Sequence, residues 1–145
     1  MSRSHKLAWA AGFIDGEGYV TIERRTRFSK RTNENTLYHS LKLGVNHVHP
    51  APIDELVGLF GGNVRYDAKV KGNRKPRYSW TLPPRLSKEV IIQIMPYLRN
   101  KKNVASLALE FQGLMEVNTT KQLSNEAIEK RDWYALEIRR INSES

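Results

Sequence analysis

The chain has 145 residues, a length typical of one domain with a sizeable core, and we expect residues 1–145 to form a single domain. Its 24 Lys and Arg outnumber its 15 Asp and Glu, and the formal charge of +9 favours a polyanionic partner such as nucleic acid. The absence of Cys excludes disulfides and thiolate zinc sites.

The first predicted element is a helix. Ser4 is a suitable N-cap for a helix over residues 5–14, and the apolar run in this helix is too short to span a bilayer and has no cleavage-site pattern. We therefore expect no membrane partner and an intracellular location, without distinguishing organelle, prokaryotic and phage compartments. Ala8, Ala11 and Gly12 form a strip of small side chains on this helix, which lets a second helix approach closely.

An acidic turn follows this helix. Asp15 and Glu17 alternate with Gly16 and Gly18, which have no side chains to keep a carboxylate away from a bulky group. In so basic a chain, this turn favours a metal-dependent enzyme that acts on a polyanion. The alternative interpretation is a helix end that carries two solvated acids.

Four segments alternate between apolar and polar residues with the period of two that is typical of half-buried strands. They cover residues 19–28, 37–47, 63–71 and 77–82. A helix over residues 53–60 separates the two pairs. Further helices are predicted over residues 87–98, 103–117 and 124–141. The resulting order, αββαββααα, predicts an α+β fold in which helices cover one face of an antiparallel sheet.

The other face of the predicted sheet is polar and mostly basic. Such a β-surface can enter the major groove of DNA and read base edges, and Glu23 and Asp67 could accept hydrogen bonds from cytosine N4. The alternative interpretation is a charged face that is merely solvated. The residues predicted to contact DNA are Thr21, Glu23, Arg25, Arg27, Tyr38, Ser40, Lys42, Gly44, Arg65, Asp67, Lys69, Arg77, Ser79 and Thr81.

Residues 10–18, which read AAGFIDGEG, resemble the signature of the LAGLIDADG homing endonucleases. The order of elements after them is similar to the αββαββα core of that family, so the resemblance covers most of the chain. It implies a site-specific endonuclease that cuts double-stranded DNA, with a four-stranded DNA-binding sheet and helices packed on one face. Because family members are usually encoded in introns or inteins, the resemblance also implies intron homing.

The resemblance assigns roles by position. It makes Glu17 the ligand of a divalent metal and the Gly16 carbonyl a second contact, with Mg²⁺ expected, Mn²⁺ as an alternative and Ca²⁺ as a substitute that does not support cleavage. Asp15 matches the first acid of the family motif, which acts in structure and at the interface. Lys101 matches a loop residue that reaches the scissile phosphate, although a lysine that solvates a helix end is the plainer interpretation. His47 matches a position that helps to order the attacking water.

A single motif implies half of a site and therefore a homodimer. The predicted interface consists of Ala8, Ala11, Gly12 and Asp15, and a symmetric dimer implies an approximately palindromic DNA target. Two other functions fit the same fold, namely an RNA maturase that assists intron splicing and a DNA-binding regulator that does not cleave. Neither needs a metal-binding acid, so the presence of Glu17 favours cleavage.

The His47–His49 pair has further interpretations. His49 could contact phosphate, or the two rings could form a stray metal pair. Two His without Cys make a poor zinc site.

Overall fold

The structure, a computed structural model, describes residues 2–68, 72, 75–117 and 124–144. The strands are β1 (Gly18–Ser29), β2 (Glu34–His47), β3 (Asn63–Asp67) and β4 (Arg77–Leu82). The helices are α1 (Arg3–Glu17), α2 (Pro50–Phe60), α3 (Pro84–Ile94), α4 (Lys102–Val117) and α5 (Asn125–Glu144), with a short 3-10 turn, η1 (Met95–Tyr97), after α3. The predicted order of elements is confirmed.

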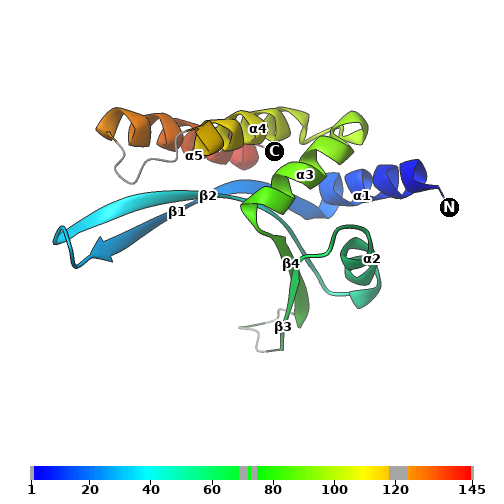
Figure 1. Ribbon diagram of the computed structural model, residues 1–145. Coiled ribbons are helices and arrows are strands. Elements are labelled where there is room, and N and C mark those ends of the chain that lie inside the picture. The colour runs from blue at the N-terminus through cyan, green and yellow to red at the C-terminus, as the bar shows by residue number, and fades with distance from the viewer. Residues whose placement is uncertain (1, 69–71, 73–74, 118–123, 145) are drawn as a thin grey trace.

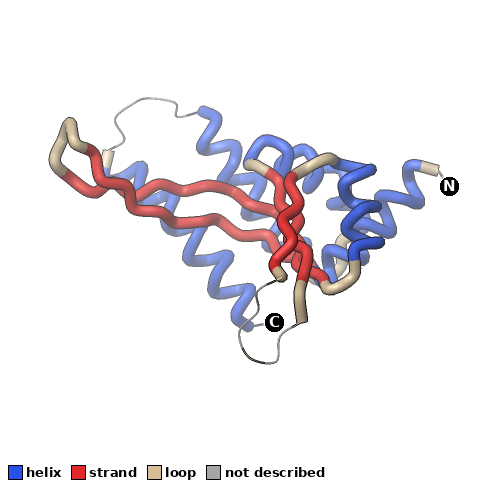
Figure 2. The backbone as a smooth tube through the Cα atoms, turned by 90° about the horizontal axis from the view of Figure 1, so that it is seen from below, coloured by secondary structure: helices blue, strands red, loops and turns tan. Residues whose placement is uncertain are grey.

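The strands form one antiparallel sheet in the order β1-β2-β4-β3. Helices α1, α3, α4 and α5 lie over one face of it (Figure 1), and the view from below shows the strands in front of the helices (Figure 2). The long β1–β2 hairpin extends to one side, whereas β3 and β4 descend from the other end of the sheet (Figure 1). The uncovered face of the sheet is therefore concave.

The hydrophobic core lies between this sheet and the helices. The alternating strand residues that were expected to face inward are fully or almost fully buried along β1, β2 and β4, except Tyr78, which is partly buried, and α1 adds small and branched side chains. These residues are Ala10, Ala11, Ile14, Val20, Ile22, Leu41, Leu43, Val45, Trp80 and Leu82. Burial of this face fixes which strand residues point away from the helices.

Helix α1 is longer than predicted at both ends. Ser2, rather than Ser4, caps it, because the Ser2 hydroxyl accepts a hydrogen bond from the His5 amide at 3.3 Å. The helix continues through the acidic turn to Glu17. At Gly18 the chain becomes extended, and a Cβ atom there would lie 3.0 Å from the Ile14 side chain. A glycine thus allows α1 to turn directly into β1.

Strand β3 differs most from the prediction. It ends at Asp67, and the side chains of Val64 and Tyr66, which were expected to be inward, are 45% and 55% exposed. The reason is its position at the edge of the sheet, since the neighbouring helix α2 packs against β2 and β4 instead. Of the rest of the predicted strand, residue 68 lies beyond its end, and residues 69–71 are outside the described residues.

A buried serine ties the helices to the sheet. The Ser87 hydroxyl, at the start of α3, donates to the Leu82 carbonyl at 3.0 Å and accepts from the Leu43 amide at 3.1 Å. Leu43 and Leu82 face each other across β2 and β4, so one hydroxyl joins both strands to α3. Within the described residues, no helix has the length and apolar character needed to cross a membrane.

We predict that Gly62→Ala destabilises the fold by about 1–3 kcal/mol, the usual cost of overpacking. Gly62 has a φ of +102°, and a Cβ atom there would lie 2.8 Å from both the Leu82 and Trp80 side chains. The matched control is Gly58→Ala in α2, where a Cβ atom meets nothing within 4 Å. Urea unfolding should show the loss in the first variant and unchanged or slightly higher stability in the control; equal stability of the two variants would contradict the prediction.

Candidate active site and nucleic-acid interface

The carboxylate of Asp15 joins the end of α1 to the segment between η1 and α4. Its oxygens accept hydrogen bonds from the Arg99 amide at 2.6 Å and from the Lys101 amide at 3.0 Å. These amides lie just before α4, where a helix has no partners of its own for its first N–H groups. Asp15 therefore stabilises the fold by joining these two segments, and its place at a dimer interface stays a prediction.

Lys101 lies at the C-terminal end of α1. Its ammonium Nζ donates to the Asp15 carbonyl at 2.8 Å, and its side chain is half-buried. The last carbonyls of a helix lack partners and carry partial negative charge, so a lysine is stabilised there. The structure thus brings Lys101 to the acidic turn, although 84 residues separate it from Glu17 in the sequence.

Glu17 is exposed at the end of α1, and Gly16 beside it is also exposed. In the described part of the chain, the Glu17 carboxylate has no hydrogen bond or ion pair, and no three His, Cys, Asp or Glu residues form a metal-sized cluster. The Glu17 carboxylate and the Gly16 carbonyl are hard oxygen donors, which suit Mg²⁺. These two groups of one chain are too few donors for a complete metal site.

His47 lies at the end of β2 against α1. Its ring meets the Phe13 ring edge-on, with centroids 5.3 Å apart, and Phe13 is one helical turn before Glu17. His47 Nδ1 lies 3.1 Å from the His49 amide nitrogen and 3.3 Å from the His49 carbonyl oxygen, so the backbone of His49 holds this edge of the ring. The two His rings are 5.5 Å apart, and no metal-sized cluster includes them among the described residues.

The small side chains of α1 divide between two faces. Ala8, Gly12 and Gly16 are exposed, whereas Ala11 is fully buried in the core of the protomer. Including Ala11 in the exposed strip is therefore wrong, because successive residues are about 100° apart around a helix and Ala11 lies at the edge of the strip, on the side of the buried Ala10 and Ile14. A Cβ atom on Gly12 or Gly16 would meet nothing within 4 Å, so packing within the protomer does not require glycine at either position.

The outward residues of β1, β2 and β4 lie on the concave face as predicted from the alternation, with one correction. Gly44 is buried rather than available for contact, because the Tyr19 ring of the neighbouring strand covers it and a Cβ atom would lie 2.5 Å from the Tyr19 hydroxyl. The alternation also places Asn46 outward, although the predicted contacts omit it; it is exposed and accepts a hydrogen bond from the Ser79 hydroxyl at 2.6 Å. Lys69 lies outside the described residues.

Charged side chains interact with one another on this face. Glu23 lies 2.8 Å from Arg25 and 3.4 Å from Lys42. Partial burial alone would raise the pKa of Glu23, but the hydrogen bond from Arg25 and the charges of Lys42 and Arg25 bring it below its ordinary value. Glu23 is therefore ionised at neutral pH and can act as an acceptor.

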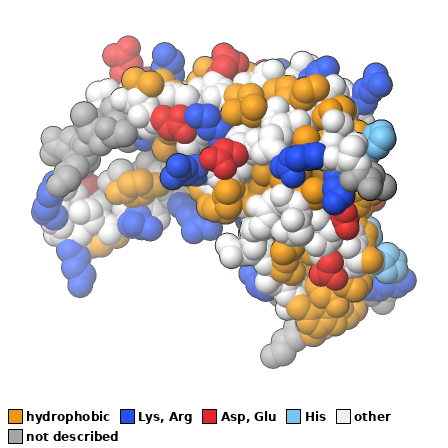
Figure 3. Space-filling view, turned by 45° about the vertical axis from the view of Figure 1, so that its right-hand side comes forward, with side chains coloured by type: hydrophobic (Ala, Val, Ile, Leu, Met, Phe, Trp, Pro, Cys, Tyr) orange, Lys and Arg blue, Asp and Glu red, His pale blue; other side chains and the backbone are white. Residues whose placement is uncertain are grey.

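The concave face is hollowed between the hairpin and the β3–β4 pair, and Figure 3 shows Lys and Arg side chains along the hairpin side of this hollow. At the hairpin, the guanidinium of Arg27 lies over the Tyr38 ring, 5.4 Å from its centroid. A shallow groove there is lined by Glu23, Arg25, Thr26, Arg27, Tyr38 and Ser40. A surface of this shape and charge suits a nucleic acid.

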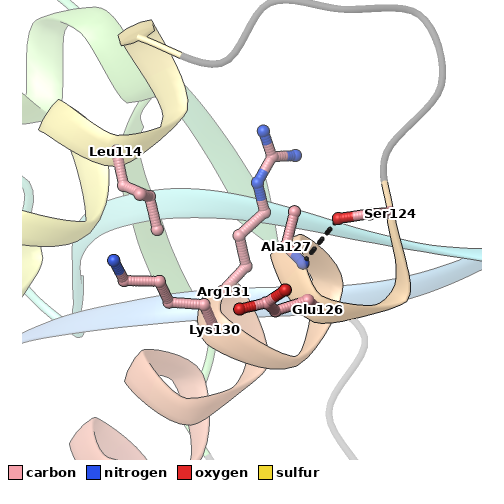
Figure 4. Close-up of a pocket in the computed structure, with 6 residues that line it drawn as sticks. All are labelled: Leu114, Ser124, Glu126, Ala127, Lys130 and Arg131. Carbon is pink, nitrogen blue, oxygen red and sulfur yellow. Dashed lines mark hydrogen bonds between the residues drawn. The ribbon is translucent and has the colours of Figure 1, made fainter.

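A second hollow lies between α4 and α5, where Leu114, Lys130 and Arg131 surround it (Figure 4). The Ser124 hydroxyl at its rim accepts a hydrogen bond from the Ala127 amide at 3.1 Å and so caps α5. None of the predicted site residues lines this hollow, which separates it from the acidic turn and the concave face.

No protein-family model and no curated protein matches the sequence. Solved structures do match the fold. The homing endonuclease I-CvuI, crystallised with its target and Ca²⁺, is 19% identical with a TM-score of 0.76 over 95% of this chain and 82% of its own. The archaeal intron-encoded homing endonuclease I-Vdi141I, crystallised with DNA, is 11% identical with a TM-score of 0.74 over 97% of this chain and 86% of its own.

A third match adds the name of the motif. The LAGLIDADG homing endonuclease I-SmaMI, bound to cleaved DNA, is 16% identical with a TM-score of 0.68 over 89% of this chain but only 42% of its own. The chain has the LAGLIDADG homing-endonuclease fold. The resemblance seen in residues 10–18 is thereby confirmed at the level of the fold, and the motif occupies the last turns of α1.

In this LAGLIDADG fold, the two acids of the motif have separate roles. Asp15 holds the start of α4 and the backbone of Lys101, while Glu17 remains exposed. The end of α1 therefore carries an exposed carboxylate, and the Lys101 ammonium binds the carbonyl of Asp15 two residues earlier.

We predict that Asp15→Asn destabilises the protein by about 1–3 kcal/mol, because an amide has one acceptor oxygen and leaves one of the two backbone N–H groups without a partner. The control is Asp54→Asn on the exposed side of α2. Urea unfolding at pH 7 measures both variants. A loss no greater than that of the control would show that the two amides find water instead.

Proposed function

We propose that this protein is a site-specific, divalent-metal-dependent endonuclease that cuts double-stranded DNA as a homodimer. The observation that carries the proposal is the acidic turn at the end of α1, where the Glu17 carboxylate is exposed and the Lys101 ammonium donates to the Asp15 carbonyl. The same chain has a hollow face with Lys and Arg side chains along it (Figure 3). The matched structures are homing endonucleases, several of them crystallised with DNA, which supports a DNA endonuclease fold.

The homodimer follows from the number of motifs. The sequence has one LAGLIDADG-like motif, and one Glu17 provides too few ligands for metal-assisted cleavage. The exposed Ala8, Gly12 and Gly16 give α1 a face that a second α1 could approach closely. The match to less than half of the I-SmaMI chain supports the same conclusion, because that chain is long enough to hold a second unit of this size.

DNA recognition is assigned to the concave face. Side chains that alternate along β1 and β2 reach one groove at increasing distances from Glu17, and a two-stranded ribbon fits the major groove. Arg25 suits guanine, and the ionised Glu23 suits the cytosine amino group. A symmetric dimer would present this surface twice, so an approximately palindromic target is expected.

Each residue of the candidate active site has a separate role in the proposed reaction. Glu17 and the Gly16 carbonyl would hold Mg²⁺, which neutralises phosphate charge and lowers the pKa of a bound water. Divalent metal use is consistent with the I-CvuI structures, which were obtained with Ca²⁺ or with Mg²⁺. Lys101 places a positive charge near the scissile phosphate, and His47, held through Nδ1, turns its Nε2 to a water or phosphate oxygen.

We predict that Glu17→Gln lowers the cleavage rate roughly 100-fold or more, because several kcal/mol of charge stabilisation depend on the bound metal and about 1.4 kcal/mol is tenfold in rate. Binding to the same duplex should persist, since removing a carboxylate also removes repulsion from phosphate. The test first incubates the wild type with a randomised duplex library and Mg²⁺, and the cut ends are sequenced to identify the target.

The matched control for this variant is Glu110→Gln, an exposed glutamate on α4. Retained cutting by Glu17→Gln would refute the assignment of the metal site. Binding without any cutting by the wild type would favour the non-cleaving regulator, and preference for intron RNA would favour the maturase.

We predict that Gly12→Leu converts the protein from a dimer, of twice the 16.7 kDa chain mass, to a monomer. The added side chain has free space in the protomer, so the fold should persist while a close contact between two α1 helices is lost. Gly58→Leu, at an exposed position in α2 that is also open, serves as the control. Sedimentation velocity that shows a monomer for the wild type, both free and on DNA, would exclude a shared site.

A further inference from the structure

Three polar side chains meet on the covered face of the sheet, outside the candidate active site. Arg24 of β1 donates from Nε and Nη2 to the two carboxylate oxygens of Asp132 in α5, at 2.6 Å and 3.0 Å. His39 of β2 shares the first of these oxygens through its Nε2 at 2.9 Å. Arg24 and His39 face each other across the two strands, so one carboxylate joins both strands of the hairpin to α5.

This cluster lies where the apolar core ends along the hairpin. Ile22 and Leu41 are the adjacent paired residues on the core side, and both are buried. Toward the turn, residues 25–38 are all described and none of them is buried. The His39 side chain is 1% exposed, so the cluster is the outermost buried contact between the hairpin and the helices.

The charge on Asp132 makes the contact strong and directional. Arg24 binds it through a two-point fork, the geometry in which a guanidinium and a carboxylate interact best. The pKa of Asp132 lies below its ordinary value because of the hydrogen bond from Arg24, and that from His39 adds to the effect against the opposing effect of burial. Asp132 therefore remains charged at neutral pH and holds both donors.

The position of β1 at Arg24 determines where its two neighbours lie. Glu23 and Arg25 flank Arg24 in the sequence, point to the concave face and interact with each other at 2.8 Å. A strand with polar side chains on both faces is weakly held in register by hydrophobic burial. The Arg24–Asp132 contact on the covered face therefore fixes the position of the strand, and with it the positions of Glu23 and Arg25 on the opposite face.

We propose that Asp132 is a positioning residue for DNA sequence recognition, which acts by fixing Arg24 and His39 so that Glu23 and Arg25 meet defined base pairs. This role rests on the proposed function, because it requires that the concave face reads DNA. Asp132 itself lies in α5 against the covered face of the hairpin, so its carboxylate is on the side of the sheet opposite the concave face.

The test compares Asp132→Asn with Glu116→Gln, which removes a matched charge from the Lys88–Glu116 pair between α3 and α4. Binding is measured by fluorescence anisotropy on a panel in which every base pair of the target is substituted in turn. Arg25→Ala identifies the positions that Arg25 reads. Asp132→Asn should lower base preference at those positions at least fivefold and leave the salt dependence of binding unchanged, because no phosphate contact is lost. Glu116→Gln should leave both unchanged.

A second measurement needs no DNA. Hydrogen–deuterium exchange in Asp132→Asn should rise in residues 25–38 and stay unchanged in the core half of the hairpin. Arg24→Lys, which keeps the charge but loses the fork, should show the same pattern in a weaker form if Asp132→Asn is too unstable to study.

The outcomes separate the two proposals. A wild type without any sequence preference overturns both the proposed function and the positioning role. If the wild type is selective and Asp132→Asn folds but keeps the same base preferences, the positioning role alone is overturned. If Asp132→Asn loses binding equally at all positions, or if Asp132→Asn and Arg24→Lys both unfold, the cluster contributes only stability. Either result also overturns the positioning role.

Discussion

The two hydrogen bonds that Asp15 accepts from the amides of Arg99 and Lys101 connect the N-terminal helix to the C-terminal helices. They join the end of α1 to the start of α4, and they place Lys101 where its ammonium meets the last carbonyls of α1. Because both oxygens of its carboxylate bind these amides, Asp15 stabilises the fold. Glu17, two residues later, is the last residue of the helix and is exposed.

Residues on the sheet also divide into two sets. Alternate residues of β1 and β2 point into the core or toward the concave face, so the packing of one set fixes the position of the other. Near the acidic turn, buried residues such as Val20 and Leu43 hold the strands. Farther along the hairpin, polar contacts replace them. The surface proposed to read DNA therefore depends on hydrophobic burial at one end and on hydrogen bonds at the other.

Sequence patterns predicted the elements best where a single periodic face is buried. The alternation of Val20 and Ile22 with polar neighbours defined β1 because the helices cover one side of it. The same reasoning failed for Val64 and Tyr66, since an edge strand has apolar residues without a helix above them. It also misplaced Ala11, because a small side chain is compatible with both a crowded core and a close helix contact.

Contacts between distant segments could not be predicted from the sequence. Asp132 is 108 residues from Arg24 and 93 from His39, and no local pattern relates them. Lys101 was expected near the acidic turn because of the family resemblance, but its bond to the Asp15 carbonyl required the structure. The outer half of the hairpin shows why this matters. Its sequence leaves the register loosely specified, and a carboxylate from the last helix contacts both strands at that point. Under the proposed positioning role, sequence preference depends on residues that never contact a base, in addition to those that do.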